Sequence, residues 1–530
     1  MFRKEGNSNT VKEVMQARFS NFETFLKPAP YPAIINLENA VAFFKEKVEQ
    51  GQTVTIVGDY DYDGICSTAI LTKALRLYGI EPKMRLPKRF SEGYGLSEKI
   101  IDEIPSGLII TVDNGIAASA AIKKAKEKGL STIIIDHHLP PVNKEGQNVL
   151  PPADVLVDPW AYSDSEYTEY CGAGLAYRFA EELLPKTDLG DLKVLASIAT
   201  ITDVMNLWGA NRILVREGLS LINKGRLVPG LRQLLKKLQL DTHITENDYA
   251  FTIGPIFNAP GRLYDNGAAE YALDILTADF RDYKLPWKCG KLIDINEERK
   301  AKVKEALKKL DLNSYPADKG IVLYDPYWGE GIIGLIAGKV CEKKGTPVIV
   351  FTKTASGVLK GSGRSTPDIH LKKILDKISE DTLGYGGHKG AAGLSIKEED
   401  LEKFTYDFQN LTEHEIKSDD ISYDLELPFD LSFTIEELKK YAPYGQGNKR
   451  IRFHFFYHVD KVEALGDDGT HIRFSKKDES VELIGFDMYH PYLSMGAPEV
   501  IEAVGYLSEQ WFNGRMKYQI ELIYFEPYNC

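Results

Sequence analysis

Three clusters of aspartate and histidine each follow a short apolar run in the first third of the chain. Carboxylates neutralise a divalent cation, and imidazole favours manganese, iron or zinc over calcium. Metal-assisted hydrolysis is the chemistry that these residue types support, because a bound cation activates water and neutralises charge. The three clusters are 58-GDYDYDG-64, 113-DNG-115 and 136-DHH-138.

A fourth candidate ligand, Asp203, lies on a predicted helix at 194–207. It follows Ala196 and Ala199 at spacings that place all three on one helix face. Small residues there allow close packing, and a carboxylate buried on that face would be costly without a cation. In the loop just beyond the strand, Asp61 and Asp63 can both turn inward.

Other interpretations of these clusters are weaker. The first cluster matches the opening of an EF-hand calcium loop, but position twelve, counted from Asp59, is Ile70 rather than glutamate. DNG alone can be a turn and DHH alone a helix cap, whereas three clusters at successive strand ends are harder to explain as turns. The segment 171-CGAGLAY-177 lacks the third glycine of a dinucleotide loop, and no Walker A motif indicates ATP chemistry.

The clusters are predicted to lie at one edge of a parallel sheet. Continuous apolar runs alternate with helical spacing, which is typical of a parallel sheet covered by helices on both faces. Ligands bind at the carboxyl edge of such sheets. Gly129 closes one helix in the position that favours glycine. The expected strands are 53–58, 107–112, 131–136 and 154–159, and the expected helices are 65–78, 116–128, 172–184 and 190–206.

The remaining chain predicts further elements in three blocks. Residues 211–310 are expected to be largely helical, and 285–310 to form a long connecting helix whose basic excess fits a solvated face as well as a DNA contact. A second, smaller α/β domain is predicted from strands at 320–324 and 347–351 around a helix at 331–343. Short runs after residue 450 predict a small barrel or sandwich. These runs are 451–459, 481–486, 500–507 and 516–525.

Composition limits the class of protein. The chain has 530 residues, of which 43% are hydrophobic and 27% charged, so it can bury a core and is neither fibrous nor disordered. The net charge of −12 excludes a chain coated in positive charge but allows a local basic groove. The five scattered cysteines predict neither a disulfide framework nor a thiolate zinc site. Without a signal peptide or an apolar membrane span, a cytoplasmic location is expected.

The chain resembles the DHH phosphoesterase superfamily in its three clusters and Asp203. Further segments resemble the RecJ single-strand-specific exonucleases over nearly the whole length. They are 91-SEGYGL-96, 254-GPIFNAPGRL-263, 331-GIIGLIAGKV-340, 361-GSGRS-365, 384-GYGGHKGAAG-393 and 443-PYGQGN-448. One departure is visible, because RecJ chains commonly carry a Trp-His pair where this chain has Trp328 and Gly329.

The resemblance implies an α/β fold in several domains: a parallel-sheet DHH domain, connecting helices, a smaller α/β DHHA1 domain and a C-terminal β-barrel with the OB-fold. The expected division is an N-terminal segment at 1–50, the DHH domain at 51–215, the helical connector at 216–318, the DHHA1 domain at 319–415 and an OB-fold-like single-strand-binding domain at 416–530.

The resemblance also implies a centre with two divalent cations, with manganese expected and magnesium as the alternative. Asp113 is the expected bridging ligand. Asp59 and Asp136 are either ligands or carboxylates that orient the histidines, and His138 is expected beside the scissile phosphate. The other implied ligands are Asp61, Asp63, His137 and Asp203.

Substrate-binding residues are implied in the same way. Tyr94 is expected to stack on a terminal base, and His388 to close on the substrate from the second α/β domain. The residues expected to grip a 5′ phosphate are Arg89, Arg262, Ser362 and Arg364.

The implied activity is 5′→3′ hydrolysis of single-stranded DNA to 5′ mononucleotides, in DNA repair and recombination. The implied partners are single-stranded DNA with a 5′ end, a single-strand-binding protein and a helicase, and a monomer is expected. Aromatic residues of the C-terminal runs fit base stacking or simple core packing. They are Phe453, Phe455, Phe456, Tyr457 and Trp511.

Two alternatives stay open. A phosphodiesterase of short oligoribonucleotides or cyclic dinucleotides could use the same metal centre, but it would leave the β-rich tail unexplained. A non-catalytic relative that serves as a DNA-binding scaffold should have lost metal ligands, whereas this chain keeps the whole set.

Overall fold

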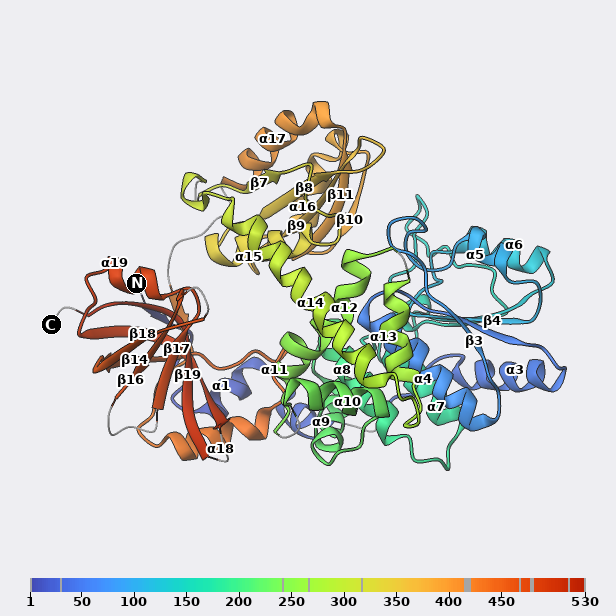
Figure 1. The fold of residues 1–530 in the computed structure, drawn as a ribbon, viewed down its shortest axis with the longest axis horizontal. Coiled ribbons are helices and arrows are strands. Elements are labelled where there is room, and N and C mark those ends of the chain that lie inside the picture. The colour runs from blue at the N-terminus through green and yellow to red at the C-terminus, as the bar shows by residue number, and fades with distance from the viewer. Residues whose placement is uncertain are drawn as a thin grey trace.

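The computed structural model describes residues 2–28, 31–240, 243–265, 267–315, 318–413, 421–466, 469–476, 481–512 and 515–528. Three large sheets are joined by a group of helices near the centre of the molecule (Figure 1), and a fourth sheet has two strands. The predicted boundary between residues 415 and 416, the side chain of Trp511 and Cys530 lie outside the described residues.

The first sheet has five strands in the order β3-β2-β4-β5-β6, and all neighbouring strands are parallel. Four of the strands were predicted from apolar runs. The fifth, β3, was not, because it has only three residues and two of them are basic. The strands are β2 (Val54–Val57), β3 (Lys83–Arg85), β4 (Leu108–Val112), β5 (Ser131–Ile135) and β6 (Val155–Val157).

Helices cover both faces of this sheet, as the continuous apolar strands predict. In β5, Ile133 and Ile135 join the core under α3 and α7, whereas Ile134 joins the core under α5 and α6. Gly129 follows α6 with φ +74°, the left-handed conformation predicted for it. The helices of this domain are α3 (Leu37–Glu49), α4 (Tyr62–Tyr78), α5 (Glu98–Glu103), α6 (Ser119–Glu127), α7 (Gly172–Leu183) and α8 (Gly190–Thr202).

A helical connector leads to the second sheet. Its last helix, α14, runs from Leu285 to Lys308, which confirms the long helix predicted there. At 1.5 Å per residue its 24 residues span about 36 Å. Figure 1 shows α14 rising from the central helices toward the second α/β domain. The other connector helices are α9 (Gly209–Asn223), α10 (Pro229–Leu238), α11 (Glu246–Asp248), η2 (Tyr249–Ile253), α12 (Gly254–Leu263) and α13 (Ala268–Thr277).

The second sheet has the order β10-β11-β9-β8-β7, and only β7 and β8 are parallel. Its two faces are buried by α15 on one side and by α16 and α17 on the other. The elements are β7 (Ile321–Tyr324), α15 (Ile333–Lys344), β8 (Val348–Lys353), β9 (Leu359–Arg364), α16 (Leu371–Lys377), β10 (Gly384–Gly387), β11 (Ala391–Ile396) and α17 (Leu401–Glu413).

The C-terminal sheet has seven strands in the order β13-β14-β18-β19-β17-β16-β15, curled around one core. Of the aromatic residues singled out for base stacking, Phe453, Phe455 and Tyr457 are buried in that core, and Phe456 is 53% exposed. Core packing therefore accounts for three of them. The elements are β13 (Leu425–Glu426), α18 (Leu431–Tyr441), β14 (Phe453–His458), β15 (Lys461–Leu465), β16 (His471–Ser475), β17 (Val481–Gly485), α19 (Tyr489–Ser494), β18 (Val500–Phe512) and β19 (Arg515–Pro527).

The N-terminal residues pack against this last domain rather than against the first (Figure 1). Strand β1 (Phe2–Lys4) pairs with β12 (Ile421–Tyr423), and helices α1 (Val11–Arg18) and α2 (Phe22–Leu26) contribute to the C-terminal core. Arg18 forms an ion pair with Asp424 at 2.8 Å. Among the described residues, no helix is both long and apolar enough to cross a membrane.

Candidate metal centre

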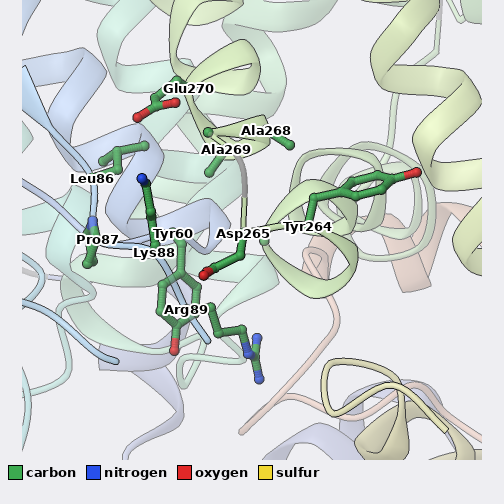
Figure 2. Close-up of a pocket in the computed structure, with 12 residues that line it drawn as sticks. Tyr60, Leu86, Pro87, Lys88, Arg89, Tyr264, Asp265, Ala268, Ala269 and Glu270 are labelled. Carbon is green, nitrogen blue, oxygen red and sulfur yellow. The ribbon is translucent and has the colours of Figure 1, made fainter. Parts of the chain in front are cut away.

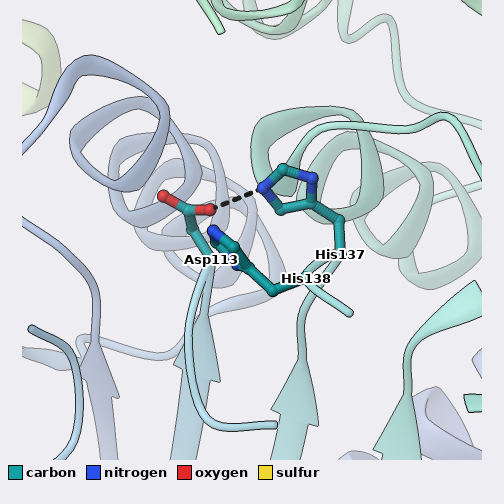
Figure 3. Close-up of side chains that lie close together, drawn as sticks. All are labelled: Asp113, His137 and His138. Carbon is teal, nitrogen blue, oxygen red and sulfur yellow. Dashed lines mark hydrogen bonds and ion pairs between the residues drawn. The ribbon is translucent and has the colours of Figure 1, made fainter. Parts of the chain in front are cut away.

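The three predicted clusters meet at the carboxyl edge of the first sheet. Asp113 follows β4 directly, and Asp136 and His137 follow β5. The Nε2 atom of His137 lies 3.0 Å from Oδ1 of Asp113, and Figure 3 shows the two side chains facing each other. The expected site therefore forms where neighbouring parallel strands end.

Asp61 and Asp63 both turn inward because the strand ends before them. Asp61 caps the N-terminus of α4 by accepting a hydrogen bond from the Gly64 amide at 3.1 Å, and Asp63 lies in the first turn of that helix. A Cβ on Gly64 would lie 2.6 Å from the Asp59 amide nitrogen. Glycine is thus required for the strand to turn this tightly into the helix.

Asp203 completes the group as the residue at the C-terminal end of α8. Its Oδ2 atom lies 3.8 Å from Nε2 of His137, which is also 3.6 Å from Oδ2 of Asp63. Ligand atoms lie within 4.8 Å of one another in three groups: Asp63, His137 and Asp203; Asp59, Asp61 and Asp113; and Asp113, His137 and His138. The first two groups share no residue.

The electrostatics of the cluster favour a bound cation. Burial, reinforced by the neighbouring carboxylates Asp63 and Asp61, raises the pKa of Asp113 well above its ordinary value. Burial and Asp63 raise the pKa of Asp203 in the same way. Both carboxylate oxygens of Asp59 are buried and, among the described residues, receive no side-chain hydrogen bond. Buried carboxylates without partners are costly, so this donor set fits divalent cations.

Asp63 is held by the N-terminus of α7, which the sequence did not reveal. The amides of Gly172 and Ala173 donate to its two carboxylate oxygens at 2.7 and 2.8 Å. These residues belong to the CGAG segment, which lacks the third glycine of a dinucleotide loop. A Cβ on Gly172 would lie 2.6 Å from Cβ of Asp113, so only glycine lets the helix approach. In the sequence, only the two glycines of this segment pointed to such a close contact.

Gly172→Ala is therefore expected to weaken Mn²⁺ binding by about 10–100-fold, because Asp63 and Asp113 can no longer hold their positions. Overpacking should also lower the free energy of unfolding by about 1–3 kcal/mol. Calorimetric titration with MnCl₂ and a urea melt measure both effects. The matched control is Gly290→Ala in α14, where a Cβ would meet only the end of Lys237 at 3.7 Å. Equal metal affinity in both variants would contradict the prediction.

Asp136 is saturated by hydrogen bonds from the protein. Its oxygens accept from the Ile116 amide at 2.9 Å, the His137 amide at 2.8 Å and Nδ1 of His138 at 2.8 Å. Burial lowers the pKa of His138, but Asp136 and further carboxylates outweigh it and raise that pKa to about 9. Asp136 is absent from the three ligand groups of the described residues. This geometry supports its role as the carboxylate that orients His138.

Tyr94 lies beside the same histidine. Its hydroxyl donates to the backbone carbonyl of Asp113 at 2.6 Å and lies 3.2 Å from Nδ1 of His138. Tyr94 is 48% exposed, so part of this residue is accessible to a ligand. The expected base-stacking residue thus adjoins the metal cluster.

An arginine cluster lies next to the carboxylates. Burial, together with the charges of Arg89 and Arg364, lowers the pKa of Arg262 to about 10, and Asp61 opposes this effect. Arg89 stacks on the Tyr60 ring at 5.1 Å, and Figure 2 shows both around a pocket. The positive charge of Arg299 in α14 also lowers the pKa of Arg262. Arg299 was not among the binding residues expected from the sequence. Guanidinium groups that lie near one another in this way are chemically suited to bind a phosphate or carboxylate.

The second α/β domain contributes Arg364 and Ser362 to the arginine cluster. Arg364 donates to Oγ of Ser362 at 3.2 Å. A Cβ on Gly334 would lie 2.9 Å from the same Oγ, and one on Gly331 would lie 1.9 Å from the Arg262 carbonyl. The start of α15 is thus packed tightly between the predicted arginines and serine. His388 is exposed in the turn between β10 and β11, and no contact of the described residues joins it to the metal cluster.

Known families match three parts of the chain. The DHH family, N-terminal domain, matches residues 53–202, the DHHA1 domain matches 317–413, and the RecJ OB domain matches 423–524. The single-stranded-DNA-specific exonuclease RecJ of Dickeya dadantii is 31% identical over 473 residues, which cover 82% of this chain and 81% of that protein. The chain belongs to the RecJ family. The predicted fold class and resemblance are confirmed.

Other RecJ proteins extend the likeness. RecJ of Thermus thermophilus is 32% identical over 499 residues, covering 92% of this chain and 70% of that protein. Its crystal structure with Mn²⁺ has a TM-score of 0.80 at 29% identity, over 98% of this chain and 76% of that chain. Its structure with Mg²⁺ has a TM-score of 0.74 at 27% identity, over 98% and 74%. With the buried Asp/His cluster, these complexes support divalent-metal binding.

This chain has Gly329 where RecJ chains commonly have histidine, and no crowding by the described residues explains the difference. A Cβ at this position would meet nothing within 4 Å. The adjacent Trp328 is packed normally against the core beneath α15, and its carbonyl accepts a hydrogen bond from Thr352. The backbone would thus accommodate a larger side chain.

Proposed function

We propose that the protein degrades single-stranded DNA from the 5′ end and releases 5′ mononucleotides. The observation that carries this proposal is the arginine cluster beside the metal ligands, with Asp61 close enough to act on Arg262. A terminal 5′ phosphate held by arginines would bring the next phosphodiester to the carboxylate cluster. A 3′ hydroxyl end offers no such anion, which is why the arrangement supports 5′ polarity.

Two divalent cations are proposed, with manganese preferred because His137 contributes imidazole to an otherwise carboxylate site. One would be held by Asp63, His137 and Asp203, and the other by Asp59 and Asp61, with Asp113 between them. Such cations lower the pKa of a bound water and neutralise charge on the phosphate. The α7 amides fix Asp63, so that its ligand geometry does not depend on substrate.

The remaining roles follow from protonation and position. Asp136 raises the pKa of His138 and fixes its Nδ1 atom, which favours the protonated form of the ring. Its Nε2–H would donate to a phosphate oxygen, where positive charge stabilises the transition state. Arg89, Arg262, Arg364 and Ser362 would hold the 5′ phosphate, Tyr94 would support the terminal base, and His388 would contact the substrate from the second domain.

A labelled-end time course tests this function. Single-stranded and duplex DNA with a 5′ phosphate, labelled at either end, are incubated with MnCl₂, MgCl₂ or EDTA. We expect the 5′ label to appear in mononucleotide first, on single strands, and only with metal. Mononucleotide released first from the 3′ end would contradict the polarity. Faster turnover of short RNA or a cyclic dinucleotide would favour the alternative phosphodiesterase.

The proposed cellular setting follows from the substrate. Because single strands must first be produced from duplex DNA, a helicase and a single-strand-binding protein are the proposed partners, in repair and recombination. The protein is proposed to act as a monomer in the cytoplasm.

A further inference from the structure

The loop 443–448, which follows α18 in the last domain, lies against the turn that follows Asp203. The Leu207 amide donates to the Gln446 carbonyl at 2.8 Å. A Cβ on Gly445 would lie 2.9 Å from Cδ1 of Leu207, and one on Gly447 would lie 3.0 Å from Oδ1 of Asn206. Two glycines thus allow this loop to touch the segment next to a metal ligand.

The loop 443–448 is rigid. Gly445 and Asn448 exchange backbone hydrogen bonds at 2.9 and 3.1 Å, and the buried Asn448 side chain donates to the carbonyls of Tyr441 and Pro443. The Tyr444 amide donates to Oε1 of Glu246 at 2.9 Å, which ties the loop to the helical connector. A loop fixed at both places can hold a neighbouring segment in position.

The neighbouring segment needs such support because Val204 is strained. Val204 has φ +57°, in the left-handed region that a β-branched residue rarely adopts. Its amide bonds to the Ile201 carbonyl and the Met205 amide to the Thr200 carbonyl, both at 3.1 Å, in the helix-ending turn that normally uses glycine. Val204 is 65% exposed, so burial of its side chain contributes little to offset this backbone strain.

Strained turns persist only where surrounding contacts fix them. On one side, Nδ2 of Asn206 donates to Oε2 of Glu169 at 2.9 Å, and Nδ2 of Asn211 donates to the Asn206 carbonyl. On the other side, the loop 443–448 accepts a hydrogen bond from the amide of Leu207, a residue that is fully buried. The turn 204–207 is therefore held between the first domain and a loop of the last domain.

We propose that the loop 443–448 is a positioning element for the metal centre. It holds the turn 204–207 in its strained form and so keeps the Asp203 carboxylate beside His137 and Asp63. This inference rests on the proposed metal-dependent function. It makes metal affinity depend on a segment more than 200 residues away in the sequence.

Gly447→Ala tests the positioning role in the full-length protein. A Cβ at φ +76° would press on Asn206, so we expect Mn²⁺ affinity, measured by calorimetry, to fall about tenfold. The Leu207 amide should exchange hydrogen faster in the metal-free protein. Gly496→Ala is the control, because Gly496 has φ +84° and nothing within 4 Å of its Cβ. Equal Mn²⁺ affinity in the two variants would overturn the proposal.

A rescue variant separates positioning from general destabilisation. Glycine adopts φ +57° without strain, so Val204→Gly combined with Gly447→Ala should recover most of the lost affinity. A double variant as weak as Gly447→Ala would overturn the role of the strained turn. If Gly447→Ala fails to fold, Asn206→Ala replaces it, and unchanged Mn²⁺ affinity there counts against the proposal.

These measurements need no substrate, so they are independent of the proposed activity. Loop-dependent Mn²⁺ binding in a protein that leaves single-stranded DNA intact would contradict the exonuclease but not the positioning role. An active exonuclease whose Mn²⁺ affinity is unaffected by Gly447→Ala would contradict the positioning role alone.

Discussion

Asp113→Asn is expected to reduce hydrolysis of single-stranded DNA by about a thousand-fold or more. The metal centre contributes several kcal/mol to transition-state stabilisation, and each ~1.4 kcal/mol is tenfold in rate. Asparagine tolerates the left-handed conformation of Asp113, whose φ is +60°, so the backbone should keep its shape. Initial rates with MnCl₂ on a 5′-phosphorylated single strand measure the loss.

The same substitution should stabilise the metal-free protein. The pKa of Asp113 is raised in the folded state, so its ionised form opposes folding, and this cost grows as pH rises above the unfolded-state pKa. Removing the charge relieves repulsion among the buried carboxylates. The melting temperature in EDTA should equal or exceed that of the wild type, while the increase on adding Mn²⁺ should largely disappear.

Asp102→Asn provides the control for this prediction. Asp102 is an exposed carboxylate that pairs with Lys124 at 2.7 Å on the surface, where an ion pair contributes little. The activity of the Asp102→Asn protein, and the rise in its melting temperature on adding Mn²⁺, should match those of the wild type. An active Asp113→Asn protein, or one that melts far lower than wild type in EDTA, would contradict the proposed role of Asp113.

Arg262→Met is expected to lower kcat/KM on 5′-phosphorylated single strands by about 10–100-fold. A hydrogen bond to a charged group contributes roughly 1.5–3 kcal/mol, which corresponds to that range. Arg262 keeps its proton at neutral pH, because its pKa is lowered only to about 10. Strands with a 5′ hydroxyl lack the terminal anion, so their kcat/KM should fall much less, and the preference for a 5′ phosphate should shrink.

We do not expect Arg262→Met to lower kcat/KM by unfolding the protein. Arg89 and Arg364 repel Arg262, so a neutral side chain of similar length relieves repulsion inside the cluster. Arg226→Met, which breaks the exposed pair with Asp188, serves as the control. If both kinds of 5′ end lost activity equally, Arg262 would be serving the scissile phosphate rather than the terminal one.

The sequence predicted the first sheet and its ligand edge because both are encoded locally. Apolar runs such as 131–135 identify buried parallel strands, and a polar residue directly after the run must lie at the carboxyl edge. The RecJ family and the fold class were confirmed by the comparisons. The assignments of individual site residues and the domain boundaries stay predictions.

Contacts between distant segments were decided only by the tertiary structure. The amide of Gly172 meets Asp63 across 109 residues, and Arg18 pairs with Asp424 across 406. Arg299 joins the arginine cluster from a helix whose basic residues look like an ordinary solvated face. Residue periodicity specifies an element and its buried face, but it does not specify which other element that face will meet. That choice depends on how whole domains pack, and it places the amides, arginines and strained turn around the metal ligands.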